Sequence, residues 1–212
     1  ITTDLMARKK HDELNKLYKK TSITLQVIGG WIMLAIFVNV HELYALLPEK
    51  YSGGIAVVFI ISISKFFDLM LGNNNSIIFN SKYYRTVLFL GLLLLFMVVG
   101  LNMYFIPNFG IEGAAVATLI SIAFYSLSKL LFVVFKMKLF PFTKNTLTSL
   151  AIIVVCFVLF YFWEFPFHPM VNIMLKSGLV TVLYLFLNYT LKVSSDINYV
   201  LNSALAKLKL TK

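Results

Sequence analysis

The 212-residue chain is too apolar to fold as a water-soluble domain. Hydrophobic residues make up 59% of it and charged residues 13%, and its mean hydropathy is +0.84, so the polar residues are too few to cover a surface in water. The formal net charge of +10 excludes an acidic protein. Because the basic residues flank apolar stretches, we attribute this charge to attraction for anionic lipid headgroups and not to nucleic-acid binding. The composition therefore predicts a membrane protein.

The chain begins with a polar segment, residues 1–22, that lacks the apolar core of a signal peptide. Thr2, Thr3 and Asp4 are each suitable N-cap residues, and the segment has a weak apolar side. Since the sequence starts with Ile1 and not methionine, we expect a cytoplasmic amphipathic helix that connects an upstream span to the first span of this chain.

Six apolar stretches then follow, each long enough to cross a bilayer as a helix. Crossing about 30 Å of hydrocarbon takes roughly 20 apolar residues, and the alternating pattern of a membrane barrel is absent from the sequence. We predict an all-α, polytopic membrane protein with a six-span domain over residues 23–192. The predicted spans cover residues 23–46, 54–73, 86–106, 111–135, 147–163 and 170–191.

Lysine and arginine residues mark one side of the predicted spans. Short loops that carry these residues remain in the cytoplasm. Fifteen of the 19 basic residues lie in the first segment, the tail, and the loops after the second and fourth spans, whereas the three remaining loops contain only Lys50. This alternation predicts that both termini face the cytoplasm. Residues 193–212 are amphipathic and basic, so we expect them to lie along the inner headgroup layer.

The loop between the third and fourth predicted spans is short and is followed by small residues. In the stretch "PNFG", Pro107 fixes one backbone angle and Gly110 permits a left-handed conformation, which predicts a tight turn outside the membrane. Gly113, Ala117 and Ser121 then recur every four residues. Such a small-residue face lets a neighbouring helix approach closely in lipid, so we predict that these residues form a helix-packing face.

Ionisable residues inside the spans are the best candidates for a functional site, because each costs several kcal/mol in lipid unless it meets water, a partner or a substrate. Lys65 is predicted to lie near the middle of the bilayer, and Asp68 follows three residues later on the same helix face. One interpretation is a self-neutralising Lys65–Asp68 pair. A second is a polar cavity lined by this face, with Ser62 and Asn73 nearby, and a third is that the face is turned toward lipid.

Two further lysines lie nearer the ends of predicted spans. Lys129, near the inner end of the fourth span, can extend its ammonium to the headgroups, and we favour this over cavity lining. We keep it as a candidate substrate-binding residue together with Lys65, Asp68 and Asn73. Lys176 can likewise reach the outer interface, where Glu42 is also expected.

Two classes of site receive no support from the sequence. The single cysteine, Cys156, cannot form an internal disulfide, and the three histidines lack metal-ligand spacing. No Ser/His/Asp set, phosphate-binding glycine loop or pair of carboxylates on one face is present. We therefore predict neither a metal site nor an enzyme. A membrane glycosyltransferase, the nearest enzymatic alternative, would be expected to have large outer loops, and here those loops are short.

The stretch "IPNFGIEGAAVATLIS" resembles a phrase that recurs in polysaccharide-biosynthesis flippases of the Wzx type, in the superfamily that includes multidrug and toxin extruders. The basic "ARKKHDELNKLYKKT" and the later "ELYALLPEKYSGG" resemble the loop order of that family as well. The resemblance implies a MATE-like transporter fold with two six-helix lobes around a cavity. This chain would supply the last four helices of the second lobe and two trailing helices, and its partner would be the N-terminal lobe of the same protein.

The resemblance also implies a function for the intact protein. Members of the family move undecaprenyl-diphosphate-linked oligosaccharide across the bacterial cytoplasmic (inner) membrane for surface polysaccharide such as O-antigen or capsule. Alternating access around a site between two lobes would drive the movement. No cofactor is implied apart from a coupling ion, H⁺ or Na⁺. Two other functions remain open at this stage: a drug-extruding transporter of the same fold, and a membrane assembly subunit without transport activity.

Overall fold

The computed structural model describes residues 2–210, and within this range every element is helical. The expected all-α fold class is therefore confirmed. The elements are α1 (Thr2–Ala7), α2 (His11–Ala45), the 3-10 helix η1 (Glu49–Gly54), α3 (Ile55–Met70), α4 (Asn74–Phe79), α5 (Tyr84–Met137), α6 (Lys144–Tyr161), α7 (Pro169–Thr190) and α8 (Ser195–Leu210).

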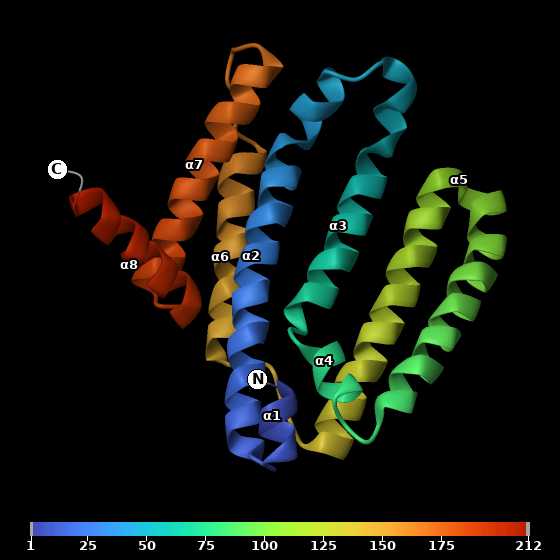
Figure 1. The fold of residues 1–212 in the computed structure, drawn as a ribbon. Helices are drawn as coiled ribbons and strands as arrows, with labels where there is room; N and C mark the ends of the chain where they lie inside the picture. The colour runs from blue at the N-terminus through green and yellow to red at the C-terminus, as the bar shows by residue number, and fades with distance from the viewer. Residues whose placement is uncertain (1, 211–212) are drawn as a thin grey trace.

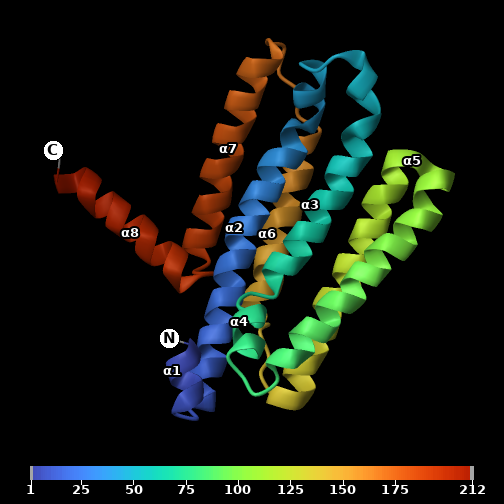
Figure 2. The same ribbon diagram turned by 45° about the vertical axis from the view of Figure 1, so that its right-hand side comes forward.

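Helix α2 is the centre of the bundle. It packs against α3 on one side and against α6 and α7 on the other, while α5 lies beyond α3 (Figures 1 and 2). Gly29 and Gly30 permit this arrangement, because a Cβ at Gly29 would press on Leu69 of α3 and a Cβ at Gly30 would meet Ile153 of α6. A helix without side chains at these two positions lets neighbours approach from opposite sides.

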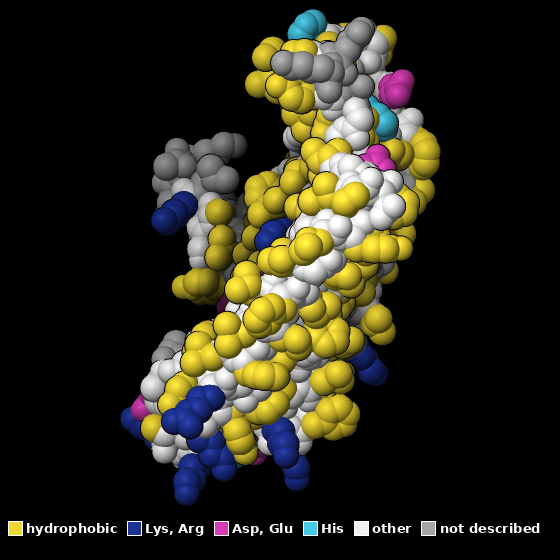
Figure 3. All heavy atoms as spheres, turned by 90° about the vertical axis from the view of Figure 1, so that its right-hand side faces the viewer, with side chains coloured by type: hydrophobic (Ala, Val, Ile, Leu, Met, Phe, Trp, Pro, Cys, Tyr) yellow, Lys and Arg dark blue, Asp and Glu magenta, His cyan; other side chains and the backbone are white. Residues whose placement is uncertain are grey.

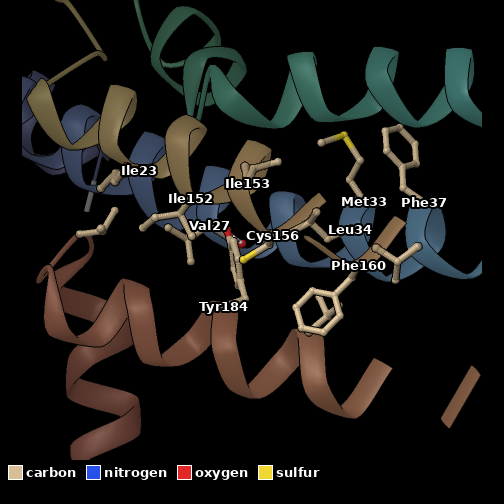
Figure 4. Close-up of a cluster of buried hydrophobic side chains, with 13 residues drawn as sticks. Ile23, Val27, Met33, Leu34, Phe37, Ile152, Ile153, Cys156, Phe160 and Tyr184 are labelled. Carbon is tan, nitrogen blue, oxygen red and sulfur yellow. Dashed lines mark hydrogen bonds between the residues drawn. The ribbon is translucent and has the colours of Figure 1, made fainter. Parts of the chain in front are cut away.

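The main core lies where α2, α6 and α7 meet (Figure 4). Tyr184 of α7 is fully buried there, and its hydroxyl donates a 2.9 Å hydrogen bond to the carbonyl oxygen of Val27. Gln26 of α2 donates a 3.0 Å bond to the carbonyl oxygen of Thr146 in α6. The buried side chain of Cys156 lies in this core beside Tyr184 (Figure 4).

Four helices in the described part of the chain are long and apolar enough to cross a membrane: α2, α5, α6 and α7. This supports a helical membrane protein but differs from the six predicted spans in two places. The second predicted span corresponds to α3, which has only 16 residues. The third and fourth predicted spans both lie within α5, a 54-residue element.

Helix α5 folds back on itself near its middle, so it consists of two antiparallel arms (Figures 1 and 2). The reversal is at Gly110, whose φ of 58° and ψ of −137° suit glycine alone. We predicted a tight turn over residues 107–110. In the structure the first arm remains helical through Pro107, and the backbone leaves the helical conformation at Gly110.

The ends of the chain also differ in detail from the predicted segments. The connecting helix expected over residues 1–22 is divided, because α1 ends at Ala7 and Lys9 adopts a left-handed backbone with φ of 54°. Its second part is continuous with the first span in α2. The predicted tail corresponds to α8, which diverges from the bundle (Figures 1 and 2) and is joined to α2 by a 2.7 Å Lys20–Asp196 ion pair.

Basic and apolar side chains are segregated on the surface. Figure 3 shows lysine and arginine gathered mostly at the end that contains α1 and the termini of α5, with hydrophobic side chains over the middle of the molecule. A second buried cluster closes this basic end, and it includes Leu14, Tyr18, Ile77, Val133 and Leu139.

Candidate functional site

A buried lysine from α5 meets a carboxylate from α3 near the basic end of the bundle. The Lys129 ammonium lies 3.5 Å from Oδ1 of Asp68, and the hydroxyl of Ser126 donates a 2.7 Å hydrogen bond to the same oxygen. Only 2% of the Lys129 side chain is exposed, compared with 45% of Asp68. The pair therefore has an enclosed cation and a carboxylate that is open on one side.

Two further groups hold the Lys129 ammonium in place. It donates a 3.0 Å hydrogen bond to Oδ1 of Asn75 at the start of α4, and it lies 4.1 Å from the centre of the Tyr125 ring. An aromatic face attracts a cation, and more strongly where water is excluded. The site thus joins α3, α4 and the second arm of α5 through one charged group.

The placement of Asp68 gives this cation a second role. Asp68 lies in the last turn of α3, which ends at Met70. A carboxylate is unfavourable at a helix C-terminus, where the unpaired carbonyl groups carry partial negative charge. Lys129 and Ser126 offset this repulsion from the neighbouring helix. Chemically, the arrangement fixes a positive charge beside a half-exposed carboxylate.

Lys65 does not join this cluster. Its side chain is exposed, and no ion pair in the described part of the chain includes it. The Lys65–Asp68 pair considered from the sequence is not formed, because Asp68 binds Lys129 and Ser126 instead. The i, i+3 spacing brings two side chains near each other but contributes only about 0.2–0.5 kcal/mol, so the tertiary contact decides the partner.

Asn73, the remaining predicted site residue, lies in the α3–α4 turn and faces α1. Its amide donates a 3.1 Å hydrogen bond to the hydroxyl of Thr2. The structure therefore brings together Asp68 and Lys129 of the four candidates, and it places Asn73 and Lys65 elsewhere. The neighbouring Asn74 is buried, and both polar atoms of its amide lack a protein partner in the described part of the chain.

The three small residues expected to pack, Gly113, Ala117 and Ser121, are all buried in the second arm of α5. A Cβ on Gly113 would overlap the carbonyl oxygen of Phe105 in the first arm. Continuing the same four-residue spacing leads through Tyr125 to Lys129. Because each four-residue step turns about 40° around a helix, this row drifts from Gly113, which faces the first arm, to Lys129, which faces α3.

A second ion pair, between α2 and α7, was not predicted. The Lys176 ammonium donates a 2.6 Å hydrogen bond to Oε1 of Glu42, and the two side chains are only 2% and 10% exposed. Nearby, the amide of Asn39 donates a 2.9 Å hydrogen bond to the hydroxyl of Ser177. We expected Lys176 and Glu42 to reach the outer interface separately. The available signal was that each is the only charged residue of its sign in its span.

The described residues contain no group of three or more histidine, cysteine or acidic side chains that could hold a metal ion. No protein-family model, curated protein or solved structure gives a significant match to this chain.

Proposed function

We propose that this chain is part of a flippase that moves undecaprenyl-diphosphate-linked oligosaccharide across the bacterial cytoplasmic membrane by alternating access. The observation that carries the proposal is the Lys129 ammonium, enclosed between apolar helices and held by Asp68 and Asn75. A charge enclosed within the helices of a membrane protein is costly and is retained mainly along substrate or ion pathways. The resemblance of residues 106–121 to Wzx-type flippases supplies the substrate class.

The chemistry of the substrate suits a cationic site of this kind. A diphosphate and its attached sugars cannot cross hydrocarbon unaided, so a transporter must replace their hydration with cations and hydrogen-bond donors. Lys129 supplies a cation, while the hydroxyl of Ser126 is committed to Asp68. Lys65, which is exposed on α3, supplies a second cation that an anionic head can approach from outside the bundle.

The distribution of charge supports a cytoplasmic location for the basic end. Lysine and arginine gather there in space (Figure 3), and loops rich in these residues remain in the cytoplasm. In this orientation α5 contributes two spans that are joined outside the membrane at Gly110, and α3 contributes one with help from η1. The proposed topology therefore has six spans with both termini inside.

The experiment is complementation of a bacterial strain that lacks its polysaccharide flippase, with the native gene encoding this chain. We expect surface polysaccharide to return with the native gene, to be lost with Lys129→Ala, and to return in part with Lys129→Arg, which retains the charge. Lys144→Ala, at the exposed start of α6, is the control and should behave as the native gene does. If the native protein inserts normally and restores nothing, the chain is an assembly subunit without this transport activity.

The exposure of Asp68 favours a second candidate, a transporter of amphiphilic cations with the same fold. Asp68 is the more open member of its ion pair, and drug extruders of this superfamily bind cations through acidic groups. Under this alternative, Asp68→Asn would abolish resistance to cationic dyes while Lys129→Arg would preserve it. Under the flippase proposal, dye resistance would be unaffected by either substitution.

A further inference from the structure

A hollow of about 780 Å³ lies at the basic end of the bundle, apart from the Asp68–Lys129 site. It is bordered by α1, the start of α2, the turn before α5 and the segment after α5. Both arms of α5 end at this hollow, through Tyr83 on one side and Met137 on the other. Since each arm has the length of a membrane span, the hollow lies at the depth of the inner headgroups.

The lining of this hollow is strongly cationic. The lining contains five lysines and one histidine but a single acidic residue, Asp12. One of the lysines, Lys10, is bound at 2.7 Å to Glu13, and this hydrogen bond and charge raise the pKa of Lys10 above its usual value. The other four lysines form no ion pair in the described part of the chain, and they are Lys9, Lys82, Lys136 and Lys138.

Two of these lysines have a backbone conformation that favours glycine. Lys9 and Lys138 have φ values of 54° and 53°, and a non-glycine residue in this left-handed region costs roughly 1–2 kcal/mol. Each follows a helix C-terminus, where glycine is the usual residue. A third lysine of this kind, Lys192 with φ of 51°, follows α7 and lines a second basic hollow, so the strain is a property of lysines after helices here and the case for this hollow depends on its lining.

The wall of the hollow is also partly apolar. Leu5, Met6 and Met137 line it together with the lysines. This combination suits an amphiphile whose charged group meets the lysines while its first carbons meet the apolar wall. Phosphate groups attract several ammonium groups at once because they carry up to two negative charges.

We propose that this hollow binds a phosphate or diphosphate group, carried either by a lipid headgroup or by a soluble compound. The inference does not rest on transport, since it requires only the lysines, the hollow and its apolar wall. It assigns Lys9, Lys82, Lys136 and Lys138 as the ligand-binding residues. Lys138 is the most informative of these. Replacing it with glycine removes both its charge and its backbone strain, and the two effects are read separately from the affinity and the thermal stability.

Binding is measured with the whole chain in nanodiscs of neutral phosphatidylcholine. In one arm, titration calorimetry with pyrophosphate tests the soluble source. In the other, native mass spectrometry counts the phosphatidic acid molecules retained when this lipid is included in the nanodisc. We expect Lys136→Gln with Lys138→Gln to lower the affinity about tenfold or more in whichever arm shows binding. Lys19→Gln with Lys144→Gln, which removes the same charge around a second basic hollow on the same side, should lower it less than twofold.

Lys138→Gly provides the decisive variant. Because glycine relieves the left-handed strain, we expect thermal stability to rise while affinity falls about threefold or more. Equal losses in the two double variants would overturn the proposal in favour of general attraction to charge. A stabilised Lys138→Gly protein with unchanged affinity, or the absence of binding in both arms, would also overturn it. Binding in one arm alone identifies the source of the phosphate. These outcomes are independent of whether surface polysaccharide is restored.

Discussion

Lys176 of α7 and Glu42 of α2 form a 2.6 Å ion pair between residues 134 positions apart in the sequence. The second carboxylate oxygen of Glu42 has no hydrogen-bond partner in the described part of the chain. The pair joins the C-terminal end of α2 to the first half of α7, and farther along the same two helices the hydroxyl of Tyr184 donates a hydrogen bond to the carbonyl oxygen of Val27. Helices α2 and α7 are therefore linked by polar contacts at two depths.

Removing one partner of the Glu42–Lys176 pair should lower the free energy of unfolding strongly, whereas replacing both partners should lower it much less. We expect Glu42→Gln to lower the free energy of unfolding by about 3–5 kcal/mol, because the buried Lys176 ammonium would lose its counter-charge. Adding Lys176→Met to that variant should recover at least half of the loss. The measurement is unfolding in mixed micelles, analysed as a double-mutant cycle. Asp4→Asn, which breaks the exposed Arg8–Asp4 pair, should cost under about 1 kcal/mol, and a similar cost for Glu42→Gln would contradict the prediction.

The hairpin of α5 depends on the absence of a side chain at Gly113. A Cβ there would overlap the backbone of Phe105 in the other arm, so we expect Gly113→Ala to destabilise the protein by about 1–3 kcal/mol. Gly100→Ala is the matched control in the same element, because nothing lies within 4 Å of a Cβ at that position. The control should be neutral or stabilising by up to about 1 kcal/mol. Thermal unfolding in detergent compares the two, and equal effects would contradict the close approach of the arms.

Hydropathy predicted the main helices because a membrane helix requires a long apolar run whatever its neighbours are. The reversal at Gly110 was also predictable, since few other residues adopt its backbone angles. Because Gly110 marks the reversal, the two arms of α5 could be predicted from the sequence as separate spans, residues 86–106 and 111–135. The C-terminal end of α3 was not predictable from hydropathy, because the apolar run continues through Leu71 while the helix ends at Met70 and Gly72 adopts a left-handed backbone.

The partners of the charged residues were harder to predict. Asp68 has Lys65 close by in sequence, yet it binds Lys129, which lies 61 residues away. The four-residue spacing that leads from Gly113 to Lys129 did not reveal this partner, because the row turns about 40° per step and Lys129 faces α3 whereas Gly113 faces the first arm of α5. The Glu42–Lys176 pair likewise joins two helices that meet only in the tertiary structure.

The Asp68–Lys129 pair should respond unequally to the loss of each partner. Asp68→Asn leaves a buried ammonium with fewer partners, and we expect a cost of about 1–2 kcal/mol, less than for a fully buried pair because Asp68 is half exposed. Lys129→Met leaves an accessible carboxylate and should cost less than Asp68→Asn. Lys65→Met should change stability by no more than about 0.5 kcal/mol. If Lys65→Met matched Asp68→Asn in the same unfolding assay, Lys65 would be the true partner.

The proposed topology predicts which turns a membrane-impermeant maleimide can reach. Cys156 is the single cysteine of the chain and is buried, so the native protein should remain unlabelled in intact spheroplasts. Asn108→Cys, next to the Gly110 reversal, should be labelled in intact spheroplasts, whereas Phe140→Cys, between α5 and α6, should be labelled only after lysis. Both positions are exposed, so a difference between them reflects the side of the membrane and not burial. Labelling of Phe140→Cys in intact spheroplasts, with Asn108→Cys protected, would reverse the orientation. In that case the phosphate-binding hollow would be outside the cell, because it lies at the same end of α5 as Phe140.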